Sequence, residues 1–280
     1  MMFVIQTDES SLLDVDANTV RTIIDSERAW QLSDPRNADK TATVGYILCS
    51  IDQIGQMAMS TDAIPVGSLE FCSTVARVHG VVADIPAINI PKPLCQPQYT
   101  QRDIVVARTR EETVDAVASM GACYIKPYDV AKRFPATLVS SVRDIVAFPY
   151  LEPFFVSRAF PLHGDNSIES EWRVFFSHGK ATPVGVVPYA SASRWLYHTP
   201  SRDFAEKVLS QLQPMMLDGT FPPSGTLDIA VLQNGNNAII EMHPFISCGL
   251  YGFEDSAILP MLRDSWHWFS KFAKRGDSTR

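Results

Sequence analysis

The stretch LDIAVLQNGNNAIIEMHPF, residues 227–245, gives the strongest local signal in the chain. Two apolar runs flank Asn234-Gly235, and an Asn-Gly pair in that position is a strong signal for a tight hairpin turn. Because side chains alternate along a strand, Glu241 and His243 face the same side of the second strand. Asp228 on the first strand can lie opposite them. The stretch therefore predicts an antiparallel hairpin with two carboxylates and an imidazole on one face.

A cluster of this kind suits a divalent cation. Mg²⁺ takes oxygen ligands, usually one or two protein carboxylates, with phosphate and water filling the remaining positions. Asp228, Glu241 and His243 are therefore candidate metal ligands. Mn²⁺ is an alternative to Mg²⁺, because an imidazole is a better ligand for Mn²⁺ than for Mg²⁺. The competing interpretation is a pair of strand-end carboxylates in contact with solvent. The hairpin alone does not decide between them.

Two other strands carry basic residues in apolar surroundings. Lys126 ends the strand ACYIKP, where Pro127 restricts its backbone, and it can project a charge toward phosphate oxygens. Lys132 follows on a loop. Arg173 interrupts the apolar strand SEWRVFF, and a buried arginine needs a partner. That partner is either a phosphate or acyl phosphate held by the guanidinium fork, or Glu171 in a salt bridge. For Lys126, the alternative is an ordinary solvated lysine.

The first third of the chain predicts a small α/β domain, residues 1–98. Its elements are strands at Phe3–Gln6 and Tyr46–Ser50, and helices at Ala17–Gln31 and Leu69–Val78, the last with Ser68 as cap. Three prolines in INIPKPLCQPQY, residues 88–99, disfavour a continuing helix and indicate an extended connection.

Residues 99–280 predict an α+β domain with mostly antiparallel strands. Besides the hairpin, the predicted strands are IVVA near Ile104, ACYIKP, IVAFPY near Ile145, EWRVFF near Glu171 and ATPVGVVPY near Ala181. The predicted helices are Arg110–Met120, Asp203–Leu212 and Ser256–Lys274. The sequence therefore predicts two α/β parts, the second larger than the first.

Composition narrows the class of partner. The net charge of -7 and the pI near 5.4 give no overall electrostatic attraction to nucleic acid or to anionic membranes. The five cysteines are scattered, and none forms a CxxC pair, which argues against a zinc site or a disulfide framework. No apolar run is long enough to span a bilayer. We expect a cytoplasmic protein with neither nucleic-acid nor membrane partners.

The order YIKP, then EWRVFF, then DIAV…IIEMHPF resembles the ATP-grasp superfamily. It is most similar to a clade of phages and bacteria that is marked by one arginine and two lysines, and Arg173, Lys126 and Lys132 match these three. IPVGSLEF, residues 64–71, and SCGLYGF, residues 247–253, resemble two further segments of that clade. The resemblance therefore extends over most of the chain.

This resemblance implies an ATP-grasp fold in which ATP lies between two lobes. Lys126 and Lys132 would contact phosphate, Arg173 would hold the γ-phosphate or acyl phosphate, and Asp228 and Glu241 would hold magnesium. Lys132 and Arg173 would be the catalytic residues. The adenine would lie between two sheets against a hinge near residues 156–160, with contacts from Val156, Ser157, Ala159 and Phe160.

The implied activity is ATP-dependent amide formation between a small-molecule or peptide carboxylate and an amine, through an acyl phosphate. Two features depart from the family pattern: His243 stands where many members have asparagine, and the loop RFPATL after Lys132 lacks a glycine. These departures leave a non-catalytic ATP-binding protein, or a phosphotransferase on the same scaffold, as alternatives. The segment 191–200, with Arg194, Trp195 and Tyr197, is a candidate for substrate recognition.

Overall fold

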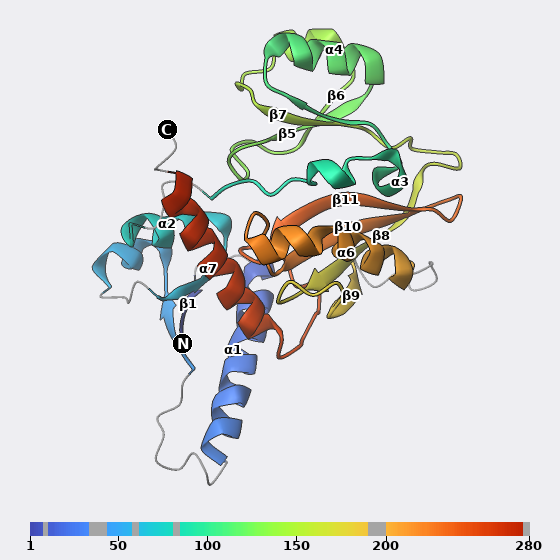
Figure 1. Cartoon of the computed structure of the whole chain (residues 1–280). Helices are drawn as coiled ribbons and strands as arrows, with labels where there is room; N and C mark the ends of the chain where they lie inside the picture. The colour runs from blue at the N-terminus through green and yellow to red at the C-terminus, as the bar shows by residue number, and fades with distance from the viewer. Residues whose placement is uncertain (8–10, 34–43, 58–61, 81–84, 190–199, 277–280) are drawn as a thin grey trace.

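The computed structural model describes residues 1–7, 11–33, 44–57, 62–80, 85–189 and 200–276 (Figure 1). Three separate sheets organise this part of the chain. The first belongs to the N-terminal third, and the other two follow it, one above the other in Figure 1. The predicted mixture of α/β architecture and antiparallel sheets is confirmed.

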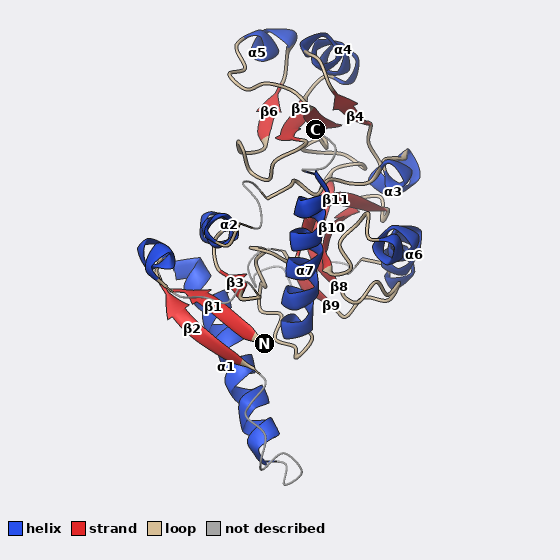
Figure 2. Cartoon of the chain, turned by 60° about the vertical axis from the view of Figure 1, so that its left-hand side comes forward, coloured by secondary structure: helices blue, strands red, loops and turns tan. Residues whose placement is uncertain are grey.

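The first sheet is parallel and has the order β2-β1-β3. Its strands are β1 (Met2–Gln6), β2 (Gly45–Cys49) and β3 (Ile64–Val66), and its helical segments are α1 (Ser11–Ser33), η2 (Ile51–Gln56) and α2 (Leu69–Val78). The C-terminal helix α7 (Ile258–Gly276) also packs against this sheet, in one apolar cluster with β1 and β3 (Figure 2). The last helix of the chain therefore completes the core of its first sheet.

The second sheet is antiparallel, with the order β4-β7-β5-β6. It consists of β4 (Ile104–Ala107), β5 (Cys123–Pro127), β6 (Thr137–Val139) and β7 (Phe154–Arg158). Helices α4 (Arg110–Met120) and α5 (Val142–Val146) cover one face. We call this sheet with its two helices the small lobe. Its other face, with Lys126 and Phe155, is directed toward the third sheet.

The third sheet has the order β11-β10-β8-β9 and is also antiparallel. Its strands are β8 (Ile168–Phe176), β9 (Gly185–Pro188), β10 (Gly225–Leu232) and β11 (Asn237–Pro244). Helix α6 (Arg202–Asp218) packs on one face through an apolar cluster. The opposite face carries the polar residues singled out from the sequence. The short segments η3 (Lys92–Leu94) and α3 (Pro97–Thr100) connect the first sheet to the second.

Local sequence signals account for most of these elements. Helices α2 and α4 have the predicted bounds, and the hydroxyls of Ser68 and Thr109 accept hydrogen bonds from Phe71 N at 3.1 Å and Glu112 N at 3.2 Å. The predicted hairpin is confirmed, with Gly235 in the left-handed region at φ 82°. The predicted division into residues 1–98 and 99–280 remains a prediction.

The strand predicted for IVAFPY near Ile145 is wrong, because Val142–Val146 form helix α5. Asp144 begins this helix by accepting hydrogen bonds from Ser140 N at 2.8 Å and Ser141 N at 2.9 Å. A short apolar run does not by itself distinguish a strand from a buried helical turn, and here the N-terminal capping decided the outcome.

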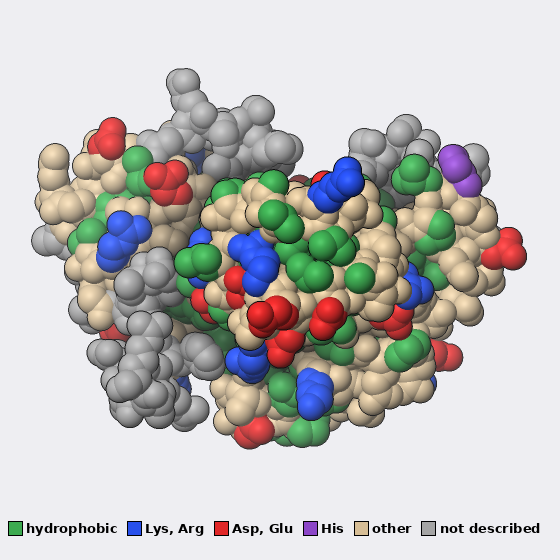
Figure 3. Space-filling view, turned by 90° about the horizontal axis from the view of Figure 1, so that it is seen from above, with side chains coloured by type: hydrophobic (Ala, Val, Ile, Leu, Met, Phe, Trp, Pro, Cys, Tyr) green, Lys and Arg blue, Asp and Glu red, His purple; other side chains and the backbone are tan. Residues whose placement is uncertain are grey.

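Two features bear on the predicted partners. Seen from above, the molecule shows acidic side chains gathered just below the centre of the face, with basic and apolar side chains around them (Figure 3). None of the described helices combines the length and apolar character that crossing a bilayer requires.

The turn between β3 and α2 generates the first testable prediction. A Cβ atom on Gly67 would lie 2.5 Å from Gln6 Oε1 and 2.6 Å from Gln6 Cβ, while one on Gly55 would meet nothing within 4 Å. Gly67→Ala should therefore lower the free energy of unfolding by roughly 1–3 kcal/mol, the scale of overpacking, and Gly55→Ala should not. Urea denaturation of both variants measures the difference. Equal stability of the two variants would contradict the tight packing of this turn.

Candidate active site

A cavity of about 550 Å³ lies where the three sheets approach one another. Its walls come from the small lobe, from the segment after β5, from β11 and the segment that follows it, and from the start of α2. The cavity brings together five of the residues predicted from the sequence: Lys126, Lys132, Arg173, Glu241 and His243. Positions as far apart in the chain as 69 and 251 therefore meet at one site.

The deepest part of the site is an ion pair between Arg173 on β8 and Asp228 on β10. Arg173 Nε donates to Asp228 Oδ1 at 2.8 Å and Nη2 donates to Oδ2 at 2.7 Å, a bidentate arrangement. The two side chains are only 3% and 1% exposed. Burial by itself lowers the pKa of Arg173, but the bonds and charge of Asp228 outweigh burial and raise that pKa. The alternative pairing of Arg173 with Glu171 is not observed.

Aromatic rings hold the same guanidinium in place. The Arg173 Cζ atom lies 5.0 Å from the ring centre of Tyr189 and 4.9 Å from that of Tyr251. Nη1 donates to the carbonyl of Gly249 at 2.9 Å. The two ring centres are 4.9 Å apart, so the rings lie side by side against the guanidinium. The guanidinium gains cation–π attraction from both while it loses water. The segment SCGLYGF, which resembles a segment of the clade, therefore packs directly on Arg173.

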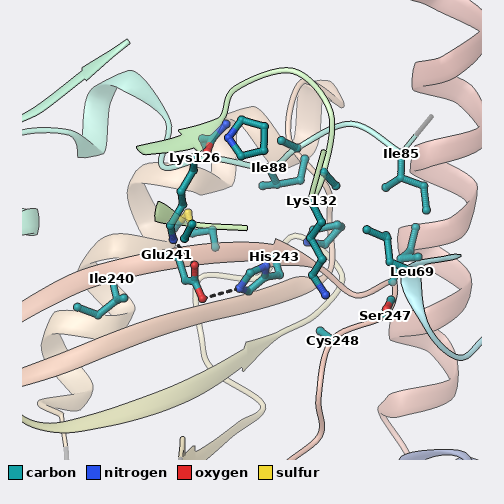
Figure 4. A pocket seen from close by; sticks show the side chains of 18 of the residues that line it. Leu69, Ile85, Ile88, Lys126, Lys132, Ile240, Glu241, His243, Ser247 and Cys248 are labelled. Carbon is teal, nitrogen blue, oxygen red and sulfur yellow. Dashed lines mark hydrogen bonds and ion pairs between the residues drawn. The ribbon is translucent and has the colours of Figure 1, made fainter. Parts of the chain in front are cut away.

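A second group of charges lies beside this pair. The Lys126 ammonium forms an ion pair with Glu241 Oε2, and His243 Nε2 lies 3.0 Å from Glu241 Oε1 (Figure 4). Burial raises the pKa of Glu241, but the bond and charge of His243 and the charge of Lys126 outweigh it, so the pKa falls well below the usual range. Glu241 is therefore ionised at neutral pH.

The sheet register explains why the acids converge. Asp228 pairs with Arg173 on one side and with Glu241 on the other, so three charged residues stand in line across three strands. His243 Nε2 lies 3.7 Å from Asp228 Oδ2. Asp228, Glu241 and His243 each offer a ligand atom, and these atoms all lie within 4.8 Å of one another. Two carboxylates and one imidazole in this arrangement fit Mg²⁺ or Mn²⁺.

Lys132 occupies the same cavity from the loop between β5 and β6. Its backbone is in the left-handed region at φ 51°, which costs a non-glycine residue roughly 1–2 kcal/mol. Ala131 N donates to the carbonyl of Ile85 at 2.8 Å, so a hydrogen bond ties this loop to the segment that leads into η3 and α3. The Lys132 side chain points across the cavity toward Cys248 (Figure 4). In the described part of the chain, no carboxylate lies within ion-pair distance of it.

The predicted hinge residues lie apart from this cluster. Val156 points into the small-lobe core under α4, and Ser157 is buried on β7. Ala159 N donates to the carbonyl of Ala122 at 2.8 Å, and Phe160 packs on the third sheet. None of the four lines the cavity. Their connection to it is Ile240, which lines the cavity and packs in the same apolar cluster as Phe160. The segment 191–199 lies outside the described residues.

Sequence reasoning missed Arg102, which joins the small lobe to the third sheet. Its guanidinium donates from Nη1 to the carbonyl of Ile239 and from Nη2 to that of Ile240, both at 2.8 Å, and lies 4.7 Å from the ring centre of Phe160. Ile240 is the extra residue of a β-bulge directly before Glu241. Burial lowers the pKa of Arg102 to about 10, although the negative charge of the nearby Glu241 acts in the opposite direction and raises this pKa. No local pattern in QRDIVVA indicates these partners.

The geometry is that of the ATP-grasp class, in which nucleotide lies between two sheets. A family model matches residues 99–261, and it describes the ATP-grasp domain of family 2 in the clade marked by one arginine and two lysines. The chain therefore belongs to this family. The resemblance found in the sequence is confirmed for the superfamily and the clade, while the association with phages stays a prediction.

A solved structure with a TM-score above 0.5 supports the same fold, and two further structures are similar at lower scores. D-alanine–D-alanine ligase from Bacillus anthracis is 11% identical, with a TM-score of 0.51 over 98% of this chain and 99% of that one. D-alanyl-alanine synthetase A from Vibrio cholerae is 14% identical, with a TM-score of 0.49 over 98% and 96%. A RimK domain ATP-grasp protein from Sphaerobacter thermophilus is 14% identical, with a TM-score of 0.48 over 98% and 100%. No curated protein matches the chain in sequence.

The buried pair generates the second prediction. Asp228→Ala leaves the Arg173 guanidinium buried without its counter-charge, which should lower the free energy of unfolding by about 3–5 kcal/mol. The matched control is Glu206→Ala, which removes the acid from the exposed pair with Arg202 and should change little. Urea denaturation reports both. If Asp228→Ala is no less stable than the control, the pair does not hold β8 to β10.

Proposed function

We propose that the protein is an ATP-dependent ligase that joins a carboxylate to an amine through an acyl phosphate. The observation that carries this proposal is the convergence of three basic side chains with three potential metal ligands in and beside one cavity of an ATP-grasp fold. Cations for the phosphates and carboxylates for a metal are the groups that phosphoryl transfer from ATP requires.

The reaction follows from this charge distribution. Lys126 and Lys132 bind phosphate oxygens of ATP, and Arg173 stabilises the γ-phosphoryl group during transfer. A substrate carboxylate oxygen attacks the γ-phosphorus, the bond to the β-phosphate oxygen breaks, and ADP leaves. The amine then attacks the acyl carbon, inorganic phosphate departs, and the nitrogen loses a proton to give the amide. The enzyme acts by positioning and electrostatic stabilisation, so no protein nucleophile is required.

A divalent ion belongs in this scheme as Mg²⁺, with Mn²⁺ as the alternative. Asp228, Glu241 and His243 would hold it, and their spacing supports that assignment. When bound, the ion neutralises negative charge on the triphosphate. His243 stands where many family members have asparagine. An imidazole ligand favours Mn²⁺ more than the amide oxygen of asparagine does.

The adenine is proposed to lie against the hinge segment 156–160. The support is Ile240, which connects the cavity to the apolar cluster around Phe160. Because the Val156 side chain faces the small-lobe core, its contribution would come through the backbone, as would that of Ala159. Phe160 and Ser157 would supply the side-chain contacts.

In the free protein, the proposed ligands of metal and phosphate bind each other. Arg173 is paired with Asp228, and Lys126 is paired with Glu241. A metal ion alone must therefore compete with two cations for its carboxylates, and phosphate alone must compete with two carboxylates for its cations. When both arrive together, each charged group exchanges one partner for another and no charge is left unpaired. Metal and nucleotide should therefore bind with positive coupling.

The third prediction measures this coupling. Mn²⁺ affinity, followed by electron paramagnetic resonance, should rise by roughly 5–150-fold when a non-hydrolysable ATP analogue is present. Lys126→Met should raise the Mn²⁺ affinity of the nucleotide-free protein, because Glu241 is released, and should weaken binding of the analogue. A merely damaged site would lose both affinities. Unchanged Mn²⁺ binding in the variant would refute the exchange of partners.

The fourth prediction tests the ligase reaction itself. Hydroxylamine traps an acyl phosphate as a hydroxamate, so incubation with Mg-ATP, hydroxylamine and a panel of carboxylates should release ADP and form a hydroxamate. Arg173→Lys keeps the charge but loses the bidentate fork, and it should reduce turnover by at least roughly 100-fold. Full activity in this variant would make Arg173 structural only. ADP with a phosphorylated acceptor and no hydroxamate would indicate a phosphotransferase, and ATP binding without ADP a non-catalytic protein.

A further inference from the structure

The cavity has two ends with different chemistry. Figure 4 shows Lys126, Glu241 and His243 in its middle, with Ile240 on one side. Beyond Lys132, the other side is bounded by Leu69 and Ile85, with Ser247 and Cys248 below them (Figure 4). Ile246 also lines the cavity, next to Ser247 in the segment after β11. We call this region, lined by Leu69, Ile85 and Ile246, the aliphatic end.

The segment IPVGSLEF contributes Leu69 to this end, which gives a role to a motif that nucleotide binding leaves unused. β3 runs parallel to β1 and ends at Val66, and Leu69 begins α2 three residues later. Ser68 N donates to Gln6 Oε1 at 2.6 Å, and the lack of a side chain on Gly67 permits this close approach. Ligands of open parallel sheets bind beyond the carboxyl ends of the strands, and Leu69 stands at that edge.

Charge decides which substrate enters here. The described lining residues include three cations, Lys126, Lys132 and Arg173, and one acid, Glu241. Two of these cations are neutralised, because Lys126 pairs with Glu241 and Arg173 pairs with Asp228. The positive charge of Lys132 therefore attracts an anionic substrate and repels an ammonium group. Lys132 lies between the charged middle and the aliphatic end (Figure 4). A carboxylate paired with Lys132 would lie beside the phosphate site and direct its substituent at the aliphatic end.

We propose, on the basis of the proposed ligase function, that the aliphatic end selects a carboxylic acid carried on an apolar chain. Leu69 is the specificity-determining residue, with the buried Ile85 packed behind it, and the Lys132 ammonium pairs with the carboxylate as well as with a phosphate oxygen of ATP. A second carboxylate or an ammonium at the far end of the chain would be desolvated against aliphatic side chains without a partner, which disfavours such acids. The carboxylate substrate is therefore a monoacid with an aliphatic or aromatic tail.

The test compares acids of equal length in the hydroxamate reaction: pentanoate, glutarate and 5-aminopentanoate, with 4-methylpentanoate as the branched member. The two apolar acids should exceed the two charged ones in kcat/KM by on the order of 100-fold. Leu69→Ala should lower kcat/KM for pentanoate by roughly 10-fold and shift the preference toward 4-methylpentanoate. The control is Leu138→Ala, which changes a 52% exposed residue on β6 outside the cavity lining and should leave the preference unchanged.

The outcomes distinguish a failure of this substrate class from a failure of the proposed ligase function. Turnover of glutarate or 5-aminopentanoate in preference to pentanoate overturns the apolar substrate class and leaves the ligase intact. If no acid gives ADP and hydroxamate, the ligase proposal fails. The apolar substrate class is then tested by calorimetry, which compares binding of pentanoate and of glutarate to the protein in the presence of a non-hydrolysable ATP analogue. Tighter binding of pentanoate, weakened by Leu69→Ala, supports it. Equal or tighter binding of glutarate overturns it.

Discussion

Arg173 and Asp228 meet across β8 and β10 with almost no access to solvent, and the site is arranged around this pair. A buried guanidinium is tolerated only with a partner of opposite charge. That requirement fixes the register of the two strands, brings the rings of Tyr189 and Tyr251 onto the guanidinium, and draws the Gly249 carbonyl to it. Because Asp228 also pairs with Glu241, the same register places the second acid, and His243 beyond it, on the cavity side.

The second constraint is the junction between the small lobe and the third sheet. Arg102 stands directly before β4 and binds two backbone carbonyls of β11 at the bulge that precedes Glu241. Through Phe160 it also contacts the segment that leaves β7. One side chain thus touches both connections through which the lobes join. Arg102 therefore ties the start of the small lobe to the strand that carries Glu241.

The proposed function gives the internal ion pairs a further meaning. Arg173–Asp228 and Lys126–Glu241 keep charged groups satisfied in the free protein, and each of the four has a second partner in the proposed complex with metal and nucleotide. These two pairs are neutral in the free protein, and metal or phosphate that arrives alone must displace an internal partner. The aliphatic end lies outside this exchange, so selection of the apolar chain of the substrate does not depend on these two ion pairs.

The sequence by itself determined the features that arise within a few residues. The Asn234-Gly235 turn fixed the hairpin, alternation put Glu241 and His243 on one face, and capping residues fixed α2 and α4. It also determined the family, since the order of its motifs follows the chain. It misassigned residues 142–146, where an apolar run fits a strand and a helical turn equally well.

Tertiary structure decided every relation between distant segments. It gave Arg173 the partner Asp228 instead of its strand neighbour Glu171, and it gave Arg102 its place between the lobes. It turned Val156 away from the cleft and placed Leu69 in the same cavity as Lys132. Local propensity carries no information about these choices. They depend on which buried charge each side chain can reach once the three sheets have packed, and that is a property of the assembled fold.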